Sequence, residues 1–404
     1  MISVRYTTTL FPTEVFPRNK SYILWLASWY PTKTIPYNGD FIQRHALATS
    51  LYHQVVVIHV IHDPSAETDV YYDISIRENL TEIIVYFRDP GPGSGLTEKI
   101  RYNLHYFRKA KNFIHQLLDV YPLPLFVHVH VPMKKGKIAM WIKQRWNLPY
   151  LVSEHDASYL KSAPDNYFSR NAYYRYNVKR IFANALAVTN VSQAVGNILL
   201  QEFSPRHFFI VRNAVDDGLF TYTQKNPAAF RFIHVSTMNY QKNIEGILSA
   251  FEKIAFQFKA VELMLTGPIP PEAIKAVTSN KAVTRILTTG EVPYKQVARL
   301  MQEADCFVMF SRYENFPCVI IEALSCGLPV ITSDVGGAGE AIQQDNGIVV
   351  SSENENELVA AMKKMIENVG FYRHAHISRE AHEQYGYTTI GRKFMDTYRT
   401  LKLL

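Results

Sequence analysis

The sequence is poor in cysteine, with three such residues, Cys306, Cys318 and Cys326, among 404. Three cysteines cannot all pair with one another, and their spacing matches no zinc-binding pattern, so neither a disulfide framework nor a structural zinc site is expected. Long apolar runs are also missing. None reaches the roughly 18–20 residues that span a bilayer, and residues 1–9 lack the apolar core of a signal peptide. We therefore expect a protein of the reducing cytoplasm.

Motifs of several enzyme classes are absent as well. No Gly-x-Gly-x-x-Gly follows the first predicted strand, which argues against a dinucleotide oxidoreductase. No Walker A sequence occurs, which argues against P-loop phosphoryl transfer, and there is no Gly-x-Ser-x-Gly nucleophile elbow. The net charge of +7 is a modest excess for this length. It favours anionic partners such as nucleotides, phosphates or membrane lipid without selecting one.

The sequence does contain short apolar strands that alternate with helical patterns, which predicts an α/β fold with parallel sheets. The predicted strands are apolar throughout, as expected for strands covered on both faces. In the first half they span residues 22–28, 54–60, 82–87, 126–131, 150–153 and 185–190. In the second half they span residues 230–235, 261–266, 286–288, 306–309, 329–331 and 347–350.

The halves meet at residues 212–227, a stretch rich in turn signals such as Asp216-Asp217-Gly218 and Asn226-Pro227. We predict two doubly wound, Rossmann-like domains, residues 1–212 and 213–387. Residues 388–404 are predicted to form a final helix that packs back on the first domain. Two such sheets facing each other leave a cleft between the carboxyl ends of their strands, where sheets of this class bind ligands.

The most informative stretch is residues 310–329, which follow the predicted strand 306–309. Pro317 suits the first turn of a helix and Gly327 its end. The helix is apolar nearly all round except for Glu322, and a buried carboxylate needs hydrogen-bond donors. The N-terminus of a helix binds a diphosphate favourably, because its free backbone N–H groups and the helix dipole attract an anion. Glu322 lies about 7.5 Å further along the axis, roughly the offset from a diphosphate to the ribose hydroxyls of its nucleoside. In a purely structural alternative, Glu322 pairs with a core arginine and Glu314 is a solvated loop charge.

Glu314 and Glu322 have the spacing of the Glu-x7-Glu motif of retaining glycosyltransferases with two Rossmann-like domains, the GT-B fold. The flanking residues 322–330 and the segment Gly336-Gly337-Ala338-Gly339-Glu340 also resemble glycosyltransferase family four, which uses sugar-nucleotide donors. Phe310 stands where the family often has proline. The resemblance implies a GT-B fold with the two domains facing across a cleft.

The resemblance also implies roles for the residues of this motif. Glu314 would contact the donor sugar as a catalytic residue, and Glu322 would hold the ribose hydroxyls. The loop between them would offer backbone N–H groups to the sugar and the diphosphate. The residues of this donor-binding loop are Asn315, Phe316, Pro317 and Cys318.

A second group of candidates lies after two other strands of the second half. Lys242 stands at the start of a predicted helix, where a cation opposes the helix dipole and an anion is expected nearby. In the family a lysine here and an arginine six residues before the helix neutralise the leaving diphosphate. Thr237 takes the place of that arginine, so another arginine or backbone N–H must complete the clamp. Glu291 and Val292 follow a further strand at a turn that presents main-chain groups to the nucleobase in the family.

In the first half, Gly39 follows the first strand within Asn38-Gly39, where the family often has two glycines. A glycine lets backbone approach a phosphate closely, and a plain turn is the alternative. His155 resembles the family histidine that lines the donor-sugar pocket, and we name it as a catalytic candidate; a structural histidine is the alternative. No third ligand accompanies His128 and His130, and no Asp-x-Asp occurs, so no metal site is predicted.

Residues 101–118 carry an apolar helical stripe with Arg101, Arg108, Lys109 and Lys111 outside it. A basic amphipathic helix can lie on an anionic membrane, so peripheral contact with the inner face of the membrane is one expectation. The alternative is a helix that docks its stripe on its own sheet and exposes a solvated basic face.

Taken together, the sequence predicts a retaining, metal-independent glycosyltransferase without a cofactor. It would transfer a sugar from a nucleoside-diphosphate sugar to a saccharide or lipid-linked saccharide acceptor in cell-surface polysaccharide or glycolipid assembly. A sugar-nucleotide epimerase on the same fold and a non-catalytic nucleotide-sugar-binding subunit remain alternatives. A nucleic-acid partner is not expected.

Overall fold

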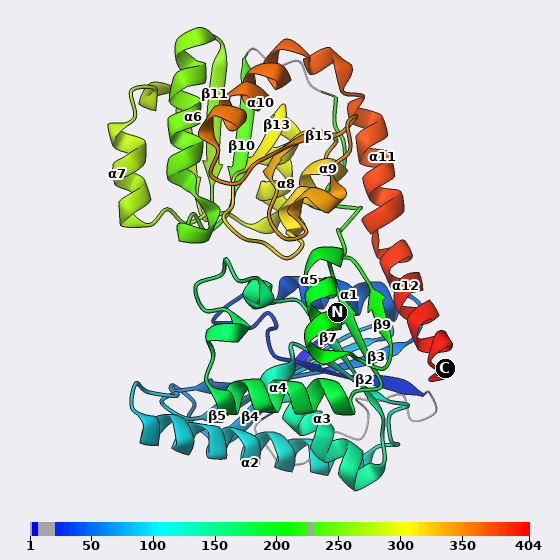
Figure 1. The fold of residues 1–404 in the computed structure, drawn as a ribbon. Coiled ribbons are helices and arrows are strands. Elements are labelled where there is room, and N and C mark those ends of the chain that lie inside the picture. Colours follow the sequence, from blue (N-terminus) through cyan, green and yellow to red (C-terminus); the bar gives the residue numbers. More distant parts are fainter. Residues whose placement is uncertain (1, 7–20, 225–228) are drawn as a thin grey trace.

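The computed structural model describes residues 2–6, 21–224 and 229–404. Figure 1 shows two domains, each a central sheet with helices against it, one above the other. The first sheet has nine strands in the order β1-β4-β5-β3-β2-β6-β7-β8-β9. Its strands are β1 (Ile2–Tyr6), β2 (Tyr22–Ala27), β3 (Gln54–Asp63), β4 (Val70–Arg77), β5 (Leu80–Arg88), β6 (Val127–His130), β7 (Tyr150–Glu154), β8 (Ala187–Asn190) and β9 (Phe208–Ile210).

Five α-helices accompany the first sheet within the described residues. They are α1 (Asp40–Ser50), α2 (Leu96–Val120), α3 (Pro132–Trp146), α4 (Ala172–Asn184) and α5 (Gln193–Phe203), with short 3-10 turns η1 (Ala157–Tyr159) and η2 (Tyr167–Ser169) before α4.

The second sheet has six parallel strands in the order β12-β11-β10-β13-β14-β15. Its strands are β10 (Phe230–Val235), β11 (Val261–Thr266), β12 (Ile286–Gly290), β13 (Cys306–Met309), β14 (Val330–Ser333) and β15 (Gly347–Val350). The helices that follow them are α6 (Ile244–Gln257), α7 (Pro271–Ser279), α8 (Tyr294–Glu303), α9 (Cys318–Ser325), α10 (Glu355–Glu367) and α11 (His374–Tyr385).

All twelve predicted strands are present, and most of them are apolar runs buried within a sheet. The exception is β12, an edge strand whose residues are largely exposed. Three further strands, β1, β4 and β9, were not predicted. The expectation of purely parallel sheets is wrong for β4, which pairs antiparallel with both β1 and β5. The β4–β5 connection is the two-residue turn Glu78-Asn79, which is long enough for a hairpin and too short for a crossover.

The last helix, α12 (Tyr387–Thr400), lies against the first domain. Ile390, Phe394 and Tyr398 share one buried cluster with Trp25 of β2. Gly391 passes the carbonyl of Ala48 on α1 so closely that a Cβ would lie 2.1 Å from that oxygen. A side chain at this position would therefore separate α12 from α1.

The chain crosses between the domains twice, and the two crossings lie side by side. Val215 on the way out forms a parallel bridge with Gly386 on the way back, and its N–H donates to the Tyr385 carbonyl at 2.9 Å. Residues 225–228, at the end of the predicted boundary segment, lie outside the described residues, as do residues 7–20. Among the described residues no helix combines the length and the apolar character that crossing a membrane requires.

Candidate active site

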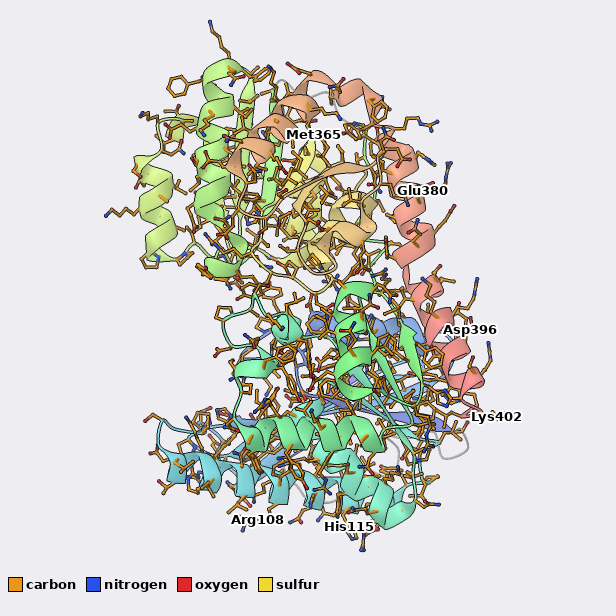
Figure 2. All side chains as sticks on the ribbon, in the orientation of Figure 1. Arg108, His115, Met365, Glu380, Asp396 and Lys402 are labelled. Carbon is orange, nitrogen blue, oxygen red and sulfur yellow. The ribbon has the colours of Figure 1, made fainter. Side chains whose placement is uncertain are left out.

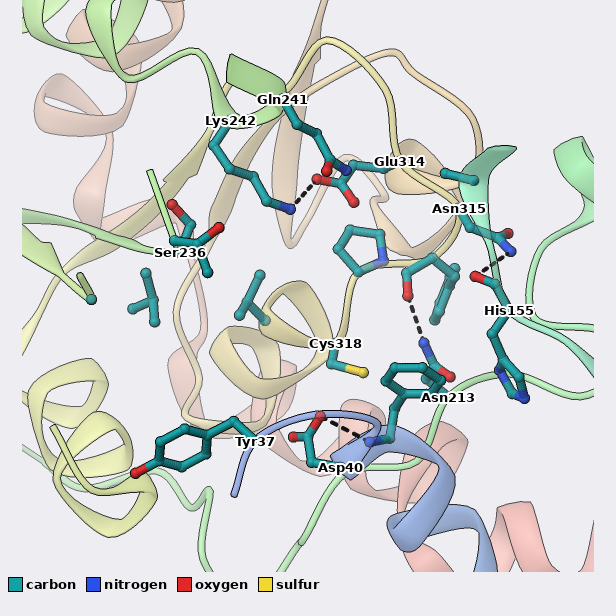
Figure 3. Close-up of a pocket in the computed structure, with 18 of the residues that line it drawn as sticks. Tyr37, Asp40, His155, Asn213, Ser236, Gln241, Lys242, Glu314, Asn315 and Cys318 are labelled. Carbon is teal, nitrogen blue, oxygen red and sulfur yellow. Dashed lines mark hydrogen bonds and ion pairs between the residues drawn. The ribbon is translucent and has the colours of Figure 1, made fainter. Parts of the chain in front are cut away.

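A cavity of about 950 Å³ lies between the domains and is lined by residues of both (Figure 3). It opens where strands end: Trp29 follows β2, His155 follows β7, Ser236 follows β10 and Gly267 follows β11. This is the location predicted for ligand binding by two facing parallel sheets. The lining includes the candidates Glu314, Lys242, His155, Glu322, Asn315, Phe316, Pro317, Cys318, Glu291, Val292 and Thr237.

Gly39 does not line the cavity. It precedes α1 with φ of 71°, a left-handed conformation that favours glycine. An added Cβ would lie 2.4 Å from the backbone carbon of Trp29. The close approach that this glycine permits is therefore to the protein's own chain, and the cavity wall at this point is formed by Asp40.

Lys242 and Glu314 meet inside the cavity as an ion pair between Nζ and Oε1. Lys242 ends a 3-10 turn, Tyr240–Lys242, just before α6, whose first turn is capped by the side chain of Asn243 at 3.3 Å from Gly246 N. Glu314 follows β13 and is 6% exposed. The anion expected next to Lys242 is thus the first glutamate of the Glu-x7-Glu motif.

Helix α9 begins at Cys318, so Pro317 is its N-cap residue rather than its first helical residue. The backbone amides of Cys318 and Val319 donate to no group among the described residues, and both residues line the cavity. Free amides and the positive end of the helix dipole therefore face the space where a ligand would lie, which is the arrangement that binds phosphate groups.

Glu322 is 1% exposed and belongs to an ion pair between the domains. Arg44 Nη1 of α1 lies 2.6 Å from Glu322 Oε1, and the Tyr294 hydroxyl donates to the same oxygen. Arg44 also contacts Asp40 Oδ2 at 2.5 Å, and its guanidinium lies 4.8 Å from the centroid of the Tyr294 ring. Burial raises the pKa of the Glu322 carboxyl, whereas Arg44 and the Tyr294 hydrogen bond lower it.

This pair combines both interpretations of Glu322. The carboxylate does bind a buried arginine, as the structural alternative proposed, but the pair itself lines the cavity. Arg44 and Tyr294 both donate to Oε1 of Glu322, and Oε2 has no hydrogen bond to the described residues. The carboxylate is thus held at one oxygen while the other is free to accept a hydrogen bond from a ligand.

The loop between the two glutamates is held by residues of the first domain and by Asn213 of the segment that joins the domains. The Asn315 side chain accepts from Ser192 Oγ at 2.5 Å and donates to the His155 carbonyl at 3.0 Å. Asn213 Nδ2 donates to the Phe316 carbonyl at 2.6 Å (Figure 3). These bonds make the geometry of the donor loop depend on the position of the first domain.

Two glycines of the motif-like segment 336–340 let the β14–η5 loop pass under the donor loop, η5 being the 3-10 turn Ala338–Ala341. A Cβ at Gly336, where φ is 53°, would lie 1.8 Å from the Glu314 carbonyl oxygen. A Cβ at Gly337 would lie 2.4 Å from the Asn315 carbonyl oxygen, to which its N–H donates at 2.8 Å. Side chains at these two positions would displace the loop that carries Glu314.

His155 belongs to a cluster of buried imidazoles with His130 and His45. The sequence did not indicate this group of three possible metal ligands. His45 Nε2 donates to the Arg212 carbonyl at 2.9 Å, which leaves a lone pair on Nδ1. His130 Nδ1 and His155 Nε2 share a hydrogen bond of 3.1 Å, so one of these rings keeps a hydrogen on its outer nitrogen. Three lone pairs therefore cannot converge on one metal ion while this bond exists.

Burial keeps these rings neutral. It lowers the pKa of His45 to about 4 and those of His130 and His155 well below the usual value. The outer nitrogen of His155, Nδ1, is buried and has no hydrogen-bond partner. A buried polar atom without a partner is costly, so this nitrogen is a cost that the fold bears within the imidazole cluster.

The remaining candidates form the outer part of the cavity. Gly290 has φ of 69° and places Glu291 and Val292 between β12 and α8, with nothing within 4 Å of an added Cβ at Gly290. Thr237 is exposed after β10. Arg44 and Arg170 line the cavity in addition to Lys242. Arg44 is already paired with Glu322 and Asp40, which leaves Arg170 as the candidate for the role of the missing arginine.

Sequence reasoning missed four residues of this site. They are Asp40, Arg44, Asn213 and Tyr294. The i,i+4 spacing of Asp40 and Arg44 directly after the Gly39 turn was a local signal for the first two. Tyr294 directly follows the candidate turn at Glu291 and Val292. Asn213 lies in the predicted boundary segment, residues 212–227, for which no ligand role was predicted.

Comparison with known proteins agrees with this architecture. Residues 229–368 match the sequence model of the family described as "Glycosyl transferases group 1". The chain is 23% identical over 368 residues to the putative teichuronic acid biosynthesis glycosyltransferase TuaC of Bacillus subtilis, covering 85% of this chain and 88% of that protein.

Two solved structures resemble nearly the whole chain. Sucrose-phosphate synthase from Thermosynechococcus elongatus has a TM-score of 0.75 at 18% identity, covering 95% of this chain and 99% of that chain. Anabaena HepE in complex with UDP-glucose has a TM-score of 0.65 at 17% identity, covering 94% and 99%. The fold is therefore GT-B, and residues 229–368 of the second domain match the group 1 glycosyltransferase family. Both findings agree with the resemblance that the residues around Glu314 and Glu322 carry.

Proposed function

We propose that this protein is a retaining glycosyltransferase that moves a sugar from a nucleoside-diphosphate sugar to a hydroxyl acceptor. The observation that carries the proposal is the meeting of three features in one cavity: the Lys242–Glu314 pair, the free amides at the start of α9, and the free Oε2 of Glu322. Together they match the diphosphate, the sugar and the ribose of such a donor.

The diphosphate would lie between Lys242 and the first turn of α9. Departure of a diphosphate is the difficult step, and donors already aimed at the developing charge stabilise it in a site that excludes water. The cavity is lined by six acidic and three basic side chains, so this local positive charge is needed to seat an anion. Donor binding would draw Lys242 from Glu314 to the phosphates.

The ribose would bind at Glu322. Arg44 and Tyr294 hold Oε1 and keep the carboxylate from turning, and Oε2 accepts a ribose hydroxyl. Hydrogen bonds to a charged acceptor are worth about 1.5–3 kcal/mol each. Arg44 would in this way act as a positioning residue for the nucleoside, although it comes from the other domain.

The sugar would lie between Glu314 and His155. Glu314, released from Lys242, would steady the sugar hydroxyls, and His155 would form part of the wall beside the sugar. No carboxylate is placed as a covalent nucleophile, so the acceptor would attack from the side of the departing phosphate, which takes the acceptor's proton. This course retains the anomeric configuration and requires neither a metal ion nor a cofactor.

The relatives support this class of substrate. The HepE structure contains UDP-glucose, and the name of TuaC refers to teichuronic acid biosynthesis. For this chain we propose a nucleotide-sugar donor and a saccharide or lipid-linked saccharide acceptor.

The first test is a thermal-shift panel of nucleotide sugars and free nucleoside diphosphates, because a ligand of the native state raises its stability. We expect at least one nucleotide sugar to raise the melting temperature. Calorimetry with that donor should show Glu322→Ala binding about 10–100-fold more weakly, from the loss of a charged hydrogen bond.

The surface variant Glu367→Ala serves as the control and should bind the donor as the wild type does. Unchanged donor affinity in Glu322→Ala would overturn the ribose assignment. Release of an epimerised sugar nucleotide without transfer to any acceptor would assign the protein to the epimerase class instead.

A further inference from the structure

Helices α2, α3 and α4 of the first domain form one continuous outer surface, along the lower part of Figure 1. Lys137 of α3 joins the other two helices: its Nζ lies 5.6 Å from the ring centroid of Phe107 on α2 and 2.7 Å from Tyr173 Oη on α4. Lys111 Nζ of α2 likewise lies 5.3 Å from the ring centroid of Trp141 on α3. We call this the three-helix surface.

The three-helix surface exposes large apolar side chains in a regular pattern. Leu96, Ile100 and Leu104 are spaced four residues apart on α2 and are 75%, 52% and 68% exposed. Tyr173 and Tyr176 on α4 are 65% and 60% exposed. Residues at this spacing form one stripe on a helix. Contiguous exposed apolar side chains of this kind mark interaction sites.

The three helices are rich in basic residues, although not all of these are free on the surface. Lys135 is buried, and Arg101, Lys109 and Lys179 pair with Asp89, Asp69 and Glu202. The three helices contain 13 lysines and arginines and two acidic residues, whereas the whole chain has a net charge of only +7. The remainder of the chain is therefore net acidic. The two acidic residues lie at the ends of α2: Glu98 accepts from Gly95 N at 2.9 Å, and Asp119 pairs with His115 at 2.6 Å. Figure 2 labels Arg108 at the outer edge of this surface.

The surface begins at the rim of the cavity. Arg170 lines the cavity, and the next residue, Asn171, is the N-cap of α4, with its side chain accepting from Tyr174 N at 2.9 Å. Helix α4 therefore runs from the cavity rim outward along the surface. A molecule held on this surface would have a short path to the donor site.

We propose that the three-helix surface docks the protein on the anionic face of a lipid bilayer, with Leu96, Ile100 and Leu104 entering the interfacial layer. An apolar stripe flanked by lysine and arginine is the pattern of a helix that lies in the membrane interface, and anionic lipid attracts basic residues within a Debye length. The inference deepens the proposed function and rests on it in one respect, that a lipid-linked acceptor would reach the cavity from this side.

Co-sedimentation with vesicles tests the proposal without any measurement of transfer. The wild type should bind vesicles of equimolar phosphatidylglycerol and phosphatidylcholine at least about tenfold better than vesicles of phosphatidylcholine alone. The double variant L96D/L104D should lose that binding at least about tenfold. Phe256→Asp is the matched control, because Phe256 is 74% exposed on α6 of the second domain; it should bind as the wild type does.

The charge is tested separately. R108E/R175E should weaken binding to the anionic vesicles, and Lys259→Glu, a charge change in the second domain, should leave it unchanged. Wild-type protein that binds neither vesicle, or L96D/L104D that binds as well as the wild type, would overturn the proposal. So would a change of L96D/L104D from dimer to monomer in size-exclusion chromatography, since a second copy would then cover the surface. Donor affinity should be the same in all these variants, so failure here is distinguishable from failure of the donor site.

Discussion

Arg44 of the first domain and Glu322 of the second form a buried ion pair, with Nη1 and Oε1 2.6 Å apart, in the wall of the cavity between the domains. A pair of this kind gives little net stability, since both charges have lost their hydration. Its geometry is nevertheless informative, because it fixes the carboxylate proposed to bind ribose only when the two domains are in contact. Donor binding and domain closure are therefore expected to be coupled.

Removal of one member of this pair should be costly. We expect Arg44→Met to lower the free energy of unfolding by roughly 3 kcal/mol, because Glu322 would remain buried without its cation. The double variant R44M/E322Q should recover most of that loss. A double-mutant cycle by chemical denaturation measures the coupling.

The exposed pair Lys363–Glu367, with atoms 3.8 Å apart, provides the control for this cycle. Lys363→Met should change the stability by less than about 0.5 kcal/mol. A loss in Arg44→Met no larger than that in Lys363→Met would show that the buried pair does not form in solution.

Lys242 is expected to act on turnover rather than on donor binding. Its partner in the cavity is the carboxylate of Glu314, and its proposed role is to neutralise the diphosphate as it leaves. We expect Lys242→Met to lower kcat by at least about 100-fold with a smaller change in donor affinity. Lys253→Met, which removes a half-exposed lysine paired with Glu355 on the surface, should leave both unchanged. Equal losses in kcat and affinity would assign Lys242 to ground-state binding alone.

The protein should unfold readily in mild acid. Burial lowers the pKa of six histidines: to about 4 for His45 and His234, to about 3 for His59 and His128, and well below the usual value for His130 and His155. Below pH 6.5 the unfolded chain takes up protons at these positions and the folded chain does not, so stability falls as the pH falls. Each contributes about 1 kcal/mol per pH unit.

Two buried acids, Glu154 and Glu322, oppose this trend, because burial raises the pKa of each carboxyl. Burial raises the pKa of Glu154 to about 8, so its contribution is present at low pH and is lost as the pH rises toward 8. Two groups cannot offset six, and acid should therefore destabilise the protein below pH 6.5. Unfolding followed by circular dichroism across this range tests the sign, and His59→Gln should flatten the acid side of the profile. A stability that stays constant from pH 7 to 5 would contradict the buried, neutral state of these rings.

Transfer should not require a divalent metal. In the cavity, Glu314 is paired with Lys242 and Glu322 with Arg44. The imidazole cluster offers two lone pairs to a metal ion rather than three. We expect full activity after treatment with EDTA and no gain on addition of Mg²⁺ or Mn²⁺. Loss of activity with EDTA and its recovery with a metal would show that a cation compensates for Thr237.

The sequence predicted the parts of the fold that depend on local pattern. Buried parallel strands are continuous apolar runs, so their positions were readable, and the helix after Pro317 was placed to within one residue. Strand β4 was also readable, because Val70, Tyr72, Ile74 and Ile76 alternate with more polar residues at the period of a half-exposed strand. The prediction rested on fully apolar runs, and an alternating strand with one exposed face does not form such a run.

The contacts that complete the site could not be predicted in the same way. Arg44 and Glu322 are 278 residues apart, and their meeting depends on how two folded domains dock. The same holds for Asn213 and Phe316, and for the bond between Asn315 and Ser192. Local spacing identified Glu314 and Glu322 as candidates, but it carried no information on which cations would face them.

The neighbouring crossings at Val215 and Gly386 limit how the molecule can open. A single connection would let one domain rotate about the other in any direction. Two hydrogen-bonded connections at one side restrict the motion to a hinge with a fixed axis. Opening would then part the far side of the cavity most and draw Arg44 from Glu322 along a defined arc. Helix α12 is also required for this arrangement. A chain truncated at Gly386 would lose the second connection between the domains and would expose the indole of Trp25 to water.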